Sequence, residues 1–214
     1  DVILVHDADD GRPWPDDVAQ RLTAAGRRCV VVQLENGERF KDIQAVERIW
    51  DAALEAGIDR HALVLGVGGG VVGDLTGFAA STLLRGVALG QVPTTLLSMV
   101  DSSVGGKTGF NRPRGKNLVG TFYQPSFVLC DVATLGTLPD DERISGLAEV
   151  VKSAWLDGEA AVAGLEADAE GLRRGLDYCP KRSSVNDGAL RIKRITDTNF
   201  PGVPQIVDWS HAAE

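Results

Sequence analysis

Residues 62–84, ALVLGVGGGVVGDLTGFAASTLL, contain the transition that decides the fold. The apolar run at residues 62–67 predicts a buried strand. The glycine cluster at residues 68–73 matches G-x-G-x-x-G, and the small residues after it predict a helix at about residues 75–84. A strand, a glycine turn and a helix in this order are typical of nucleotide-binding α/β domains, because the helix N-terminus favours a pyrophosphate.

Two features of this glycine cluster depart from a typical dinucleotide site. It follows the third predicted strand rather than the first, and no acidic residue stands about 20 positions later. A crowded strand-to-helix turn therefore remains an alternative. The later sequence Gly105-Gly106-Lys107-Thr108 resembles the end of a P-loop, but Asp101 stands where that motif needs glycine. The sequence excludes a P-loop ATPase.

The chain up to residue 139 alternates strand and helix patterns. Asp42 is placed to cap a helix that runs to about residue 56, and Gly57 is placed to end it. Near-continuous apolar strands separated by helices indicate a parallel sheet covered on both faces. The other predicted strands are residues 2–6, 29–34, 87–92 and 127–131, and a further helix is predicted at residues 16–25. We therefore predict a Rossmann-like α/β domain at residues 1–139.

A different composition begins after Pro139. Residues 141–176 are rich in alanine, leucine, glutamate and arginine, which predicts helix throughout. From about residue 178 the chain holds several prolines and a basic patch with little periodicity, and we predict no packed domain there. Residues 140–214 are thus expected to form an incomplete α-helical domain.

The composition excludes several classes of protein. The 214 residues carry a net charge of −8, with a pI near 4.9, which argues against nucleic acid or an anionic membrane as the main partner. The basic residues of the tail lack interleaved aromatic side chains. No apolar stretch is long enough for a membrane span and no signal peptide is visible. Cys29, Cys130 and Cys179 lack metal-type spacing, so we expect buried thiols and a cytoplasmic location.

The interval 93–117 concentrates polar side chains between glycines. It contains Thr94, Thr95, Asp101, Ser102, Ser103, Lys107, Thr108, Asn111, Lys116 and Asn117. Such a density of hydroxyls and lysines, together with a carboxylate, favours a loop wrapped around a polyhydroxylated, phosphorylated ligand. A solvated surface loop is the alternative.

Glu149 and Lys152 are three residues apart in the predicted C-terminal helix and share a face. An exposed ion pair is the simplest interpretation of the spacing. The surrounding sequence GLAEVVK at residues 146–152 is too apolar for an exposed face, and a buried carboxylate needs a cation or a metal beside it. We therefore treat this turn as a candidate site.

A resemblance to the 3-dehydroquinate synthase family of sugar phosphate cyclases is carried by three segments. They are GGGVVGDLTGFAAS at residues 68–81, RGVALGQVPTTLLSMVDSSVGGKTGFNRPRGKNLVGTFYQP at residues 85–125, and GLAEVVK. The block VDSSVGGKTG is the most specific part. The resemblance implies a nucleotide-binding α/β domain followed by an α-helical domain, with NAD and a divalent metal, zinc or cobalt, between them. It also implies a homodimer.

The implied enzyme is a carbon–oxygen lyase of the shikimate pathway, which leads to the aromatic amino acids. Its implied substrate is a small anionic sugar phosphate, 3-deoxy-arabino-heptulosonate 7-phosphate, and its products are 3-dehydroquinate and phosphate. NAD would oxidise a ring hydroxyl and so acidify the neighbouring proton. Phosphate would then leave by elimination, the hydride would return, and the ring would reclose by an internal aldol step.

The matched motifs imply roles for individual residues. The implied cofactor contacts are Asp7, Asp9, Glu38, Lys41, Gly69, Gly70, Val71, Asp74, Thr94, Thr95, Asp101, Lys107, Lys116, Thr137 and Leu138. The implied substrate contacts are Lys107, Lys116, Asn117 and Lys152, and the implied catalytic set is Lys152, Lys107, Asp101 and Asn117. Lysines suit the anionic ends of the substrate.

The implied metal site is only partly matched. Glu149 corresponds to the carboxylate ligand, to which the family adds two histidines from the helical domain. His6 and His61 lie in the wrong half, which leaves His211, and the position four residues before it holds Val207. A catalytic zinc usually has three protein ligands.

Several explanations of this partial match stay open. The chain is a truncated enzyme, a short homologue that binds nucleotide without catalysis, or an enzyme completed by a second chain. Another cyclase of the superfamily is a neighbouring alternative.

Overall fold

The computed structural model describes residues 1–8, 13–167, 184–187 and 205–208. Two compact units divide the chain: Asp1–Pro93 with Gly106–Leu129, and Thr94–Gly105 with Cys130–Glu214. The first unit contains a five-stranded sheet of order β2-β1-β3-β4-β7, in which every pairing is parallel. Its strands are β1 (Val2–Asp7), β2 (Cys29–Leu34), β3 (Leu63–Gly68), β4 (Ala88–Pro93) and β7 (Phe127–Val128). The predicted parallel sheet is confirmed.

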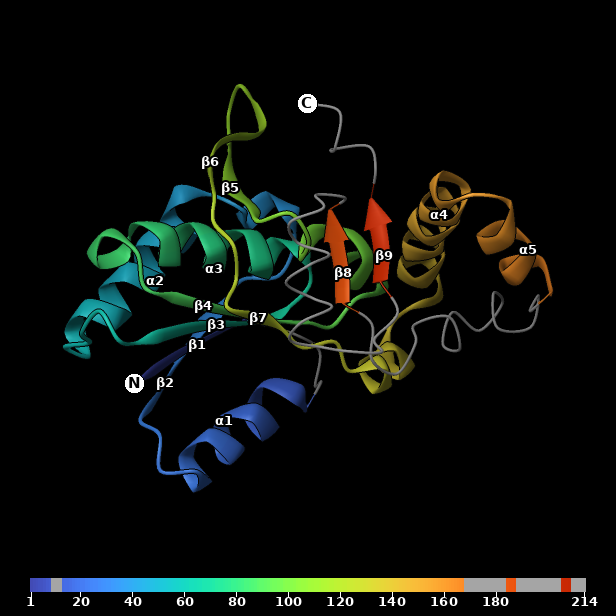
Figure 1. Ribbon diagram of the computed structural model, residues 1–214. Coiled ribbons are helices and arrows are strands. Elements are labelled where there is room, and N and C mark those ends of the chain that lie inside the picture. Colours follow the sequence, from blue (N-terminus) through green and yellow to red (C-terminus); the bar gives the residue numbers. More distant parts are fainter. Residues whose placement is uncertain (9–12, 168–183, 188–204, 209–214) are drawn as a thin grey trace. The chain divides into compact units, whose positions relative to one another are not determined.

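Helices cover both faces of this sheet. Helix α1 (Trp14–Ala24) lies on one face, and α2 (Ile43–Glu55) and α3 (Gly70–Thr82) lie on the other (Figure 1). Alternate residues of β1 enter different cores: Ile3 belongs to the cluster beneath α2 and α3, whereas Leu4 belongs to the cluster beneath α1. Both side chains are fully buried. Because both faces of the central strands β1 and β3 are largely buried, these strands are continuous apolar runs in the sequence.

The ends of α2 follow from its flanking residues. The Asp42 carboxylate accepts a hydrogen bond of 3.0 Å from the backbone N–H of Ala45, as the predicted cap requires. Gly57 follows the helix with a φ of 63°, a conformation that glycine adopts at little cost.

Helix α3 begins at Gly70, five residues before the predicted start at Leu75. Glycine has a low helix propensity, so propensity alone predicts that the helix begins after the glycines. Burial of Val72 and Leu75, each 1% exposed, stabilises this first turn instead.

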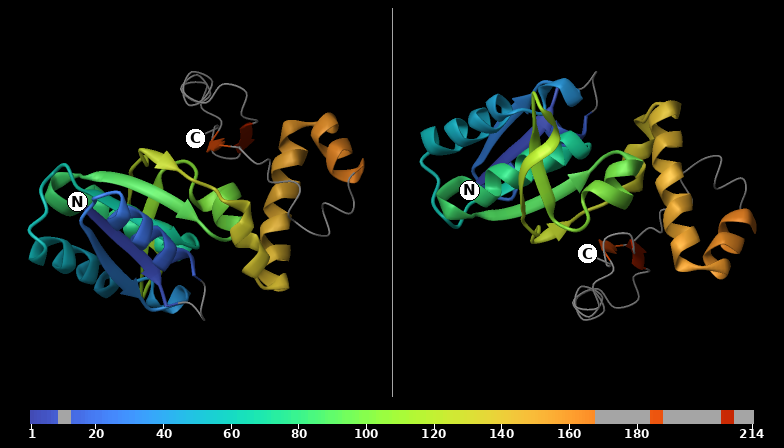
Figure 2. Two further views of the ribbon diagram at one scale, coloured as in Figure 1. Left: turned by 90° about the horizontal axis from the view of Figure 1, so that it is seen from below. Right: turned by 90° about the horizontal axis from the view of Figure 1, so that it is seen from above.

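An antiparallel hairpin occupies much of the interval that we expected to be a loop. Strands β5 (Lys107–Arg112) and β6 (Gly115–Phe122) pair along most of their length, so the loop prediction is wrong here. The hairpin crosses α3 (Figure 2), with the rings of Phe110 and Phe78 5.1 Å apart and nearly perpendicular. Gly77 of α3 permits this approach, since a Cβ there would lie 2.4 Å from Thr108 Cγ2.

The second unit is mainly helical among its described residues. Helix α4 (Asp140–Asp157) is followed by α5 (Glu159–Ala167), and the helix break at Gly158 corrects our prediction of unbroken helix. Gly158 has a φ of 114°, which a helix cannot contain. The other elements of this unit are the π-helical turn η3 (Ser98–Ser102), the 3₁₀ helix η4 (Val132–Thr137), and the strands β8 (Ser184–Asp187) and β9 (Gln205–Asp208), which pair in parallel.

Replacing Gly146 with alanine should destabilise the second unit. A Cβ at this position of α4 would lie 2.6 Å from Leu96 Cβ and 2.8 Å from the backbone nitrogen of Leu97. We expect a loss of about 1–3 kcal/mol in the free energy of unfolding, measured by urea denaturation. Gly136→Ala is the matched control in the same unit, because no atom lies within 4 Å of its added Cβ. Equal stability of the two variants would show that α4 and Leu96 do not pack closely.

The structure describes two of the three cysteines, Cys29 and Cys130. Cys29 and Cys130 are half-buried rather than fully buried as expected, and burial raises the pKa of the Cys29 thiol. Cys130 packs against the core of the second unit, and Cys179 lies outside the described residues.

Within the described ranges, none of the helices has both the length and the apolarity to cross a membrane.

Candidate functional site

The glycine turn joins the end of β3 to the first turn of α3. Gly69 is the N-cap residue, and no side chain caps this helix end. The first N–H groups of α3 therefore have no partner within the helix and are available to an anion. A Cβ on Gly68 would lie 2.7 Å from Val72 Cγ2, so glycine is required for the strand and helix to meet this closely.

Three of the predicted cofactor segments follow adjacent strands at the same edge of the sheet. Asp7 ends β1, the segment containing Glu38 and Lys41 follows β2, and Gly69 follows β3. The carboxyl ends of parallel strands lie side by side, so the fold brings these segments together. Asp9, which we also predicted to contact the cofactor, lies outside the described residues.

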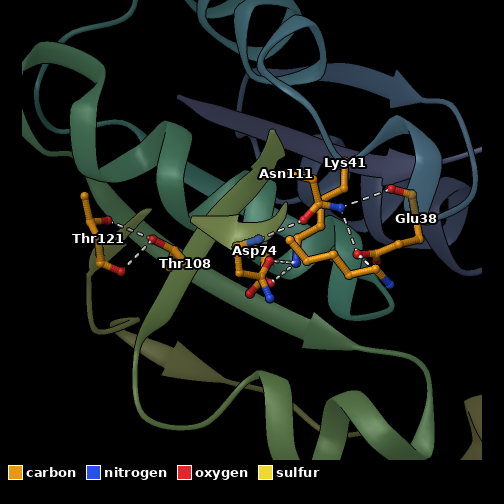
Figure 3. A network of polar contacts seen from close by, with 8 residues as sticks. Glu38, Lys41, Asp74, Thr108, Asn111 and Thr121 are labelled. Atoms are coloured by element: carbon orange, nitrogen blue, oxygen red, sulfur yellow. Dashed lines mark hydrogen bonds and ion pairs between the residues drawn. The ribbon is translucent and has the colours of Figure 1, made fainter. Parts of the chain in front are cut away.

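Lys41 is the centre of a buried polar network in the first unit. Its side chain is 5% exposed and forms an ion pair with the Asp74 carboxylate of α3 (Figure 3). The Lys41 ammonium also donates a 2.6 Å hydrogen bond to Asn117 Oδ1 of β6. Two of its three N–H donors are thus used within the protein, and one remains for a ligand.

Asn111 connects the hairpin to the segment after β2. Its Nδ2 group donates to Glu38 Oε1 at 2.8 Å and to the Glu38 carbonyl at 3.3 Å, and its backbone N–H donates to the Lys41 carbonyl at 2.7 Å (Figure 3). Lys116 Nζ lies 3.5 Å from the same Glu38 oxygen. The sequence placed Asn111 in a polar interval without giving it a role.

An open groove runs between the hairpin tip and the N-terminus of α2. Its lining carries more cations than carboxylates, which favours an anionic ligand. The lining residues are Glu38, Arg39, Lys41, Asp42, Ile43, Gln44, Asn111, Arg112, Pro113 and Lys116.

A chain of hydroxyl groups fastens the other end of the hairpin to α3. Thr108 Oγ1 and Thr121 Oγ1 are 2.7 Å apart (Figure 3). Thr121 Oγ1 also donates to Ser81 Oγ of α3 at 2.9 Å. Lys107 is exposed at the start of β5, next to this anchor. The hairpin that carries Lys107, Lys116 and Asn117 is therefore tied down at both ends.

The remaining predicted site residues belong to the second unit. Thr94 is buried, and Thr95 Oγ1 accepts a 3.1 Å hydrogen bond from the N–H of Ser98, at the start of the turn that contains Asp101. Thr137 ends η4, and the buried Leu138 follows it. The structure thus divides the predicted residues between two units.

Glu149 and Lys152 form the predicted pair on α4. Lys152 Nζ donates to Glu149 Oε1 at 2.5 Å, and the side chains are 18% exposed for Glu149 and 41% exposed for Lys152. The carboxylate is largely buried and the ammonium is not. This arrangement lies between a simple surface ion pair and a closed site.

The described residues do not by themselves fit a metal ion. Within residues 1–8, 13–167, 184–187 and 205–208, no group of three or more His, Cys, Asp or Glu side chains could hold one. Glu149 is present, whereas His211, the second predicted ligand, lies outside the described residues. One carboxylate is short of the three protein ligands that a catalytic zinc usually has.

A parallel sheet covered on both faces, with a glycine turn and cationic side chains at its carboxyl edge, defines the class of α/β proteins that bind nucleotides and phosphates. Within this class, residues 31–145 match the family model described as 3-dehydroquinate synthase N-terminal. The chain belongs to the 3-dehydroquinate synthase family.

Curated relatives give the extent of the similarity. The chain is 49% identical to 3-dehydroquinate synthase of Rhodopirellula baltica over 98% of its own length and 56% of that protein. It is 52% identical to 3-dehydroquinate synthase of Halorhodospira halophila over 73% of its own length and 44% of that protein. The chain thus spans about half the length of the curated relatives that it matches.

Two solved structures of sugar phosphate cyclases have a similar fold. A 2-deoxy-scyllo-inosose synthase in complex with carbaglucose-6-phosphate, NAD⁺ and Co²⁺ has a TM-score of 0.66 and 31% identity, covering 72% of this chain and 41% of that one. A 2-epi-5-epi-valiolone synthase from Streptomyces hygroscopicus with NAD⁺ and Zn²⁺ has a TM-score of 0.68 and 30% identity, covering 82% of this chain and 53% of that one.

Proposed function

We propose that this chain binds NAD at the glycine turn and the adjoining groove of its first unit. The observation that carries the proposal is the uncapped N-terminus of α3, which follows directly on β3 through Gly69. Its free N–H groups and the positive end of the helix dipole suit a pyrophosphate. Both cyclase structures with a similar fold hold NAD⁺, which supports this choice of ligand.

The polar network supplies groups for the rest of the nucleotide. The Glu38 carboxylate at the mouth of the groove is an acceptor for ribose hydroxyls. Lys41 keeps one N–H donor for the nucleotide, because Asp74 and Asn117 accept the other two. These contacts orient the nucleotide without a large rearrangement of the protein.

We further propose that the chain contributes to 3-dehydroquinate synthase chemistry, the conversion of 3-deoxy-arabino-heptulosonate 7-phosphate to 3-dehydroquinate and phosphate. Bound NAD supplies reversible oxidation of a ring hydroxyl. We assign Lys107, Lys116 and Asn117 of the hairpin to the anionic groups of the substrate. Asp101 and Lys152 of the second unit remain predicted participants.

No step of this proposal is assigned to a metal ion. The cyclase structures hold Co²⁺ or Zn²⁺, and Glu149 is the described residue whose carboxylate suits such an ion. The described residues supply too few ligands for it. NAD binding without catalysis is therefore the second candidate function.

Placing a negative charge beside the proposed pyrophosphate should weaken NAD binding. Val71 lies in the first turn of α3, and aspartate and asparagine there differ in charge but hardly in size. We expect Val71→Asp to bind NAD at least about ten-fold more weakly than Val71→Asn, by isothermal titration calorimetry. Equal affinity of the two variants, or no binding by the unmodified chain, would count against an NAD site at this turn.

Phosphate release separates catalysis from binding. The chain is incubated with NAD, zinc or cobalt, and the heptulosonate phosphate, with and without a chelator. Chelator-sensitive release supports the lyase proposal. NAD binding without any release supports the non-catalytic candidate instead.

A further inference from the structure

Three residues of the first unit form a closed ring of hydrogen bonds. The Lys41 carbonyl accepts from the backbone N–H of Asn111 at 2.7 Å. Asn111 Oδ1 accepts from the backbone N–H of Asn117 at 3.0 Å, and Asn117 Oδ1 accepts from the Lys41 ammonium at 2.6 Å. Because each residue is bonded to both others, the ring fixes the hairpin tip relative to the segment after β2.

Asn117 depends on this ring for its conformation. Its φ is 53°, in the left-handed region that asparagine tolerates better than most residues. In this conformation its N–H points at Asn111 and its side-chain oxygen at Lys41. The Asn117 amide N–H groups have no hydrogen-bond partner among the described residues, so they remain available to a ligand.

Asn111 also holds the Glu38 carboxylate. Its Nδ2 group reaches Glu38 Oε1 at 2.8 Å, and Lys116 Nζ lies 3.5 Å from the same oxygen. Asn111 therefore contacts Asn117 through its side-chain oxygen and Glu38 through its side-chain nitrogen. Aspartate has the same shape but, when ionised, cannot donate this second bond.

We propose that Asn111 is a positioning residue, which holds Glu38 directly and Lys41 through Asn117 in the arrangement that binds the nucleotide. Asn111 itself need not touch the ligand. The inference rests on the proposed NAD site for its functional part. Its structural part, the fixing of the hairpin tip, stands on the ring of hydrogen bonds alone.

The functional test uses Asn111→Asp with pH as the variable. Near pH 7.5 two carboxylates would face each other at Glu38, and we expect NAD to bind at least about ten-fold more weakly than to the unmodified chain. Lowering the pH favours the protonated form of the introduced carboxyl, which can donate a hydrogen bond, so the ratio of the two affinities should fall toward one as the pH is lowered.

The charged groups around this pair are included in the comparison. Lys116 faces Glu38 from β6, Lys41 and Asp74 lie in the adjoining network, and Arg39, Asp42 and Arg112 line the same groove. They are present in both the variant and the unmodified chain, so at each pH the two chains differ only at position 111. Asn111→Ala introduces no titratable group. The ratio of the NAD affinity of the unmodified chain to that of Asn111→Ala should therefore not change with pH.

Hydrogen exchange of residues 112–117 tests the structural part without any ligand. We expect this segment to exchange at least about ten-fold faster in Asn111→Ala, because the Asn117 amide loses its acceptor. Unchanged exchange overturns the inference whether or not NAD binds. If the unmodified chain binds NAD but the Asn111→Asp ratio does not vary with pH, the positioning role fails while the proposed site stands.

Discussion

Replacing Lys41 with methionine should lower the free energy of unfolding by about 3–5 kcal/mol. The side chain is 5% exposed, and its partner Asp74 is 17% exposed. Methionine fills the space of the lysine chain but leaves the Asp74 carboxylate and Asn117 Oδ1 without the ammonium. Removing the cation that pairs with a largely buried carboxylate is among the most costly changes that a single substitution can make.

Urea denaturation followed by circular dichroism measures this effect. Arg48→Met is the matched control, because Arg48 lies 3.8 Å from Glu35 with both side chains about half exposed. The free energy of unfolding of Arg48→Met should fall by no more than about 0.5 kcal/mol. If Lys41→Met were no less stable than this control, the Lys41 network would be a surface feature rather than a buried one. Adding Asp74→Asn to Lys41→Met should restore part of the stability, since it removes the carboxylate charge that faces the Lys41 ammonium in the unmodified chain.

Replacing Gly120 with alanine should prevent the β5–β6 hairpin from closing. Gly120 lies opposite Gly109, and a Cβ on Gly120 would stand 2.0 Å from the Thr108 carbonyl oxygen. The obstacle is backbone, which cannot rotate away as a side chain would. We expect the free energy of unfolding to fall by on the order of 4 kcal/mol, which corresponds to a fall of roughly 10 °C in melting temperature.

The same substitution should abolish binding of NAD in the proposed site, because Asn117, which accepts from the Lys41 ammonium, lies on β6. Gly136→Ala again serves as the control, with open space around its added methyl group. If Gly120→Ala had the same melting temperature as this control, the two strands would be able to move apart at Gly109 with little loss of stability. Calorimetry and thermal melts on both variants distinguish these outcomes.

Local sequence patterns were enough for most of the first unit. The apolar runs of β1, β2, β3 and β4 were predicted to within about two residues, and so was the Asp42 cap. The hairpin was not predicted, because glycines and polar residues in β5 and β6 conceal the strand pattern. Its strands are held by packing of Phe110 against Phe78, which lies 32 positions earlier in the chain. Such contacts leave no periodic signal in the hairpin itself.

The sequence by itself determined the parallel sheet, the glycine turn, the helix boundary at Asp42 and the family to which the chain belongs. Strand periodicity, caps and motifs are properties of neighbouring residues, so they can be read without coordinates. Only the tertiary structure decided which groups Lys41 meets. Asp74 and Asn117 lie 33 and 76 residues away from it, and burial in a folded core is what makes their pairing with one ammonium favourable.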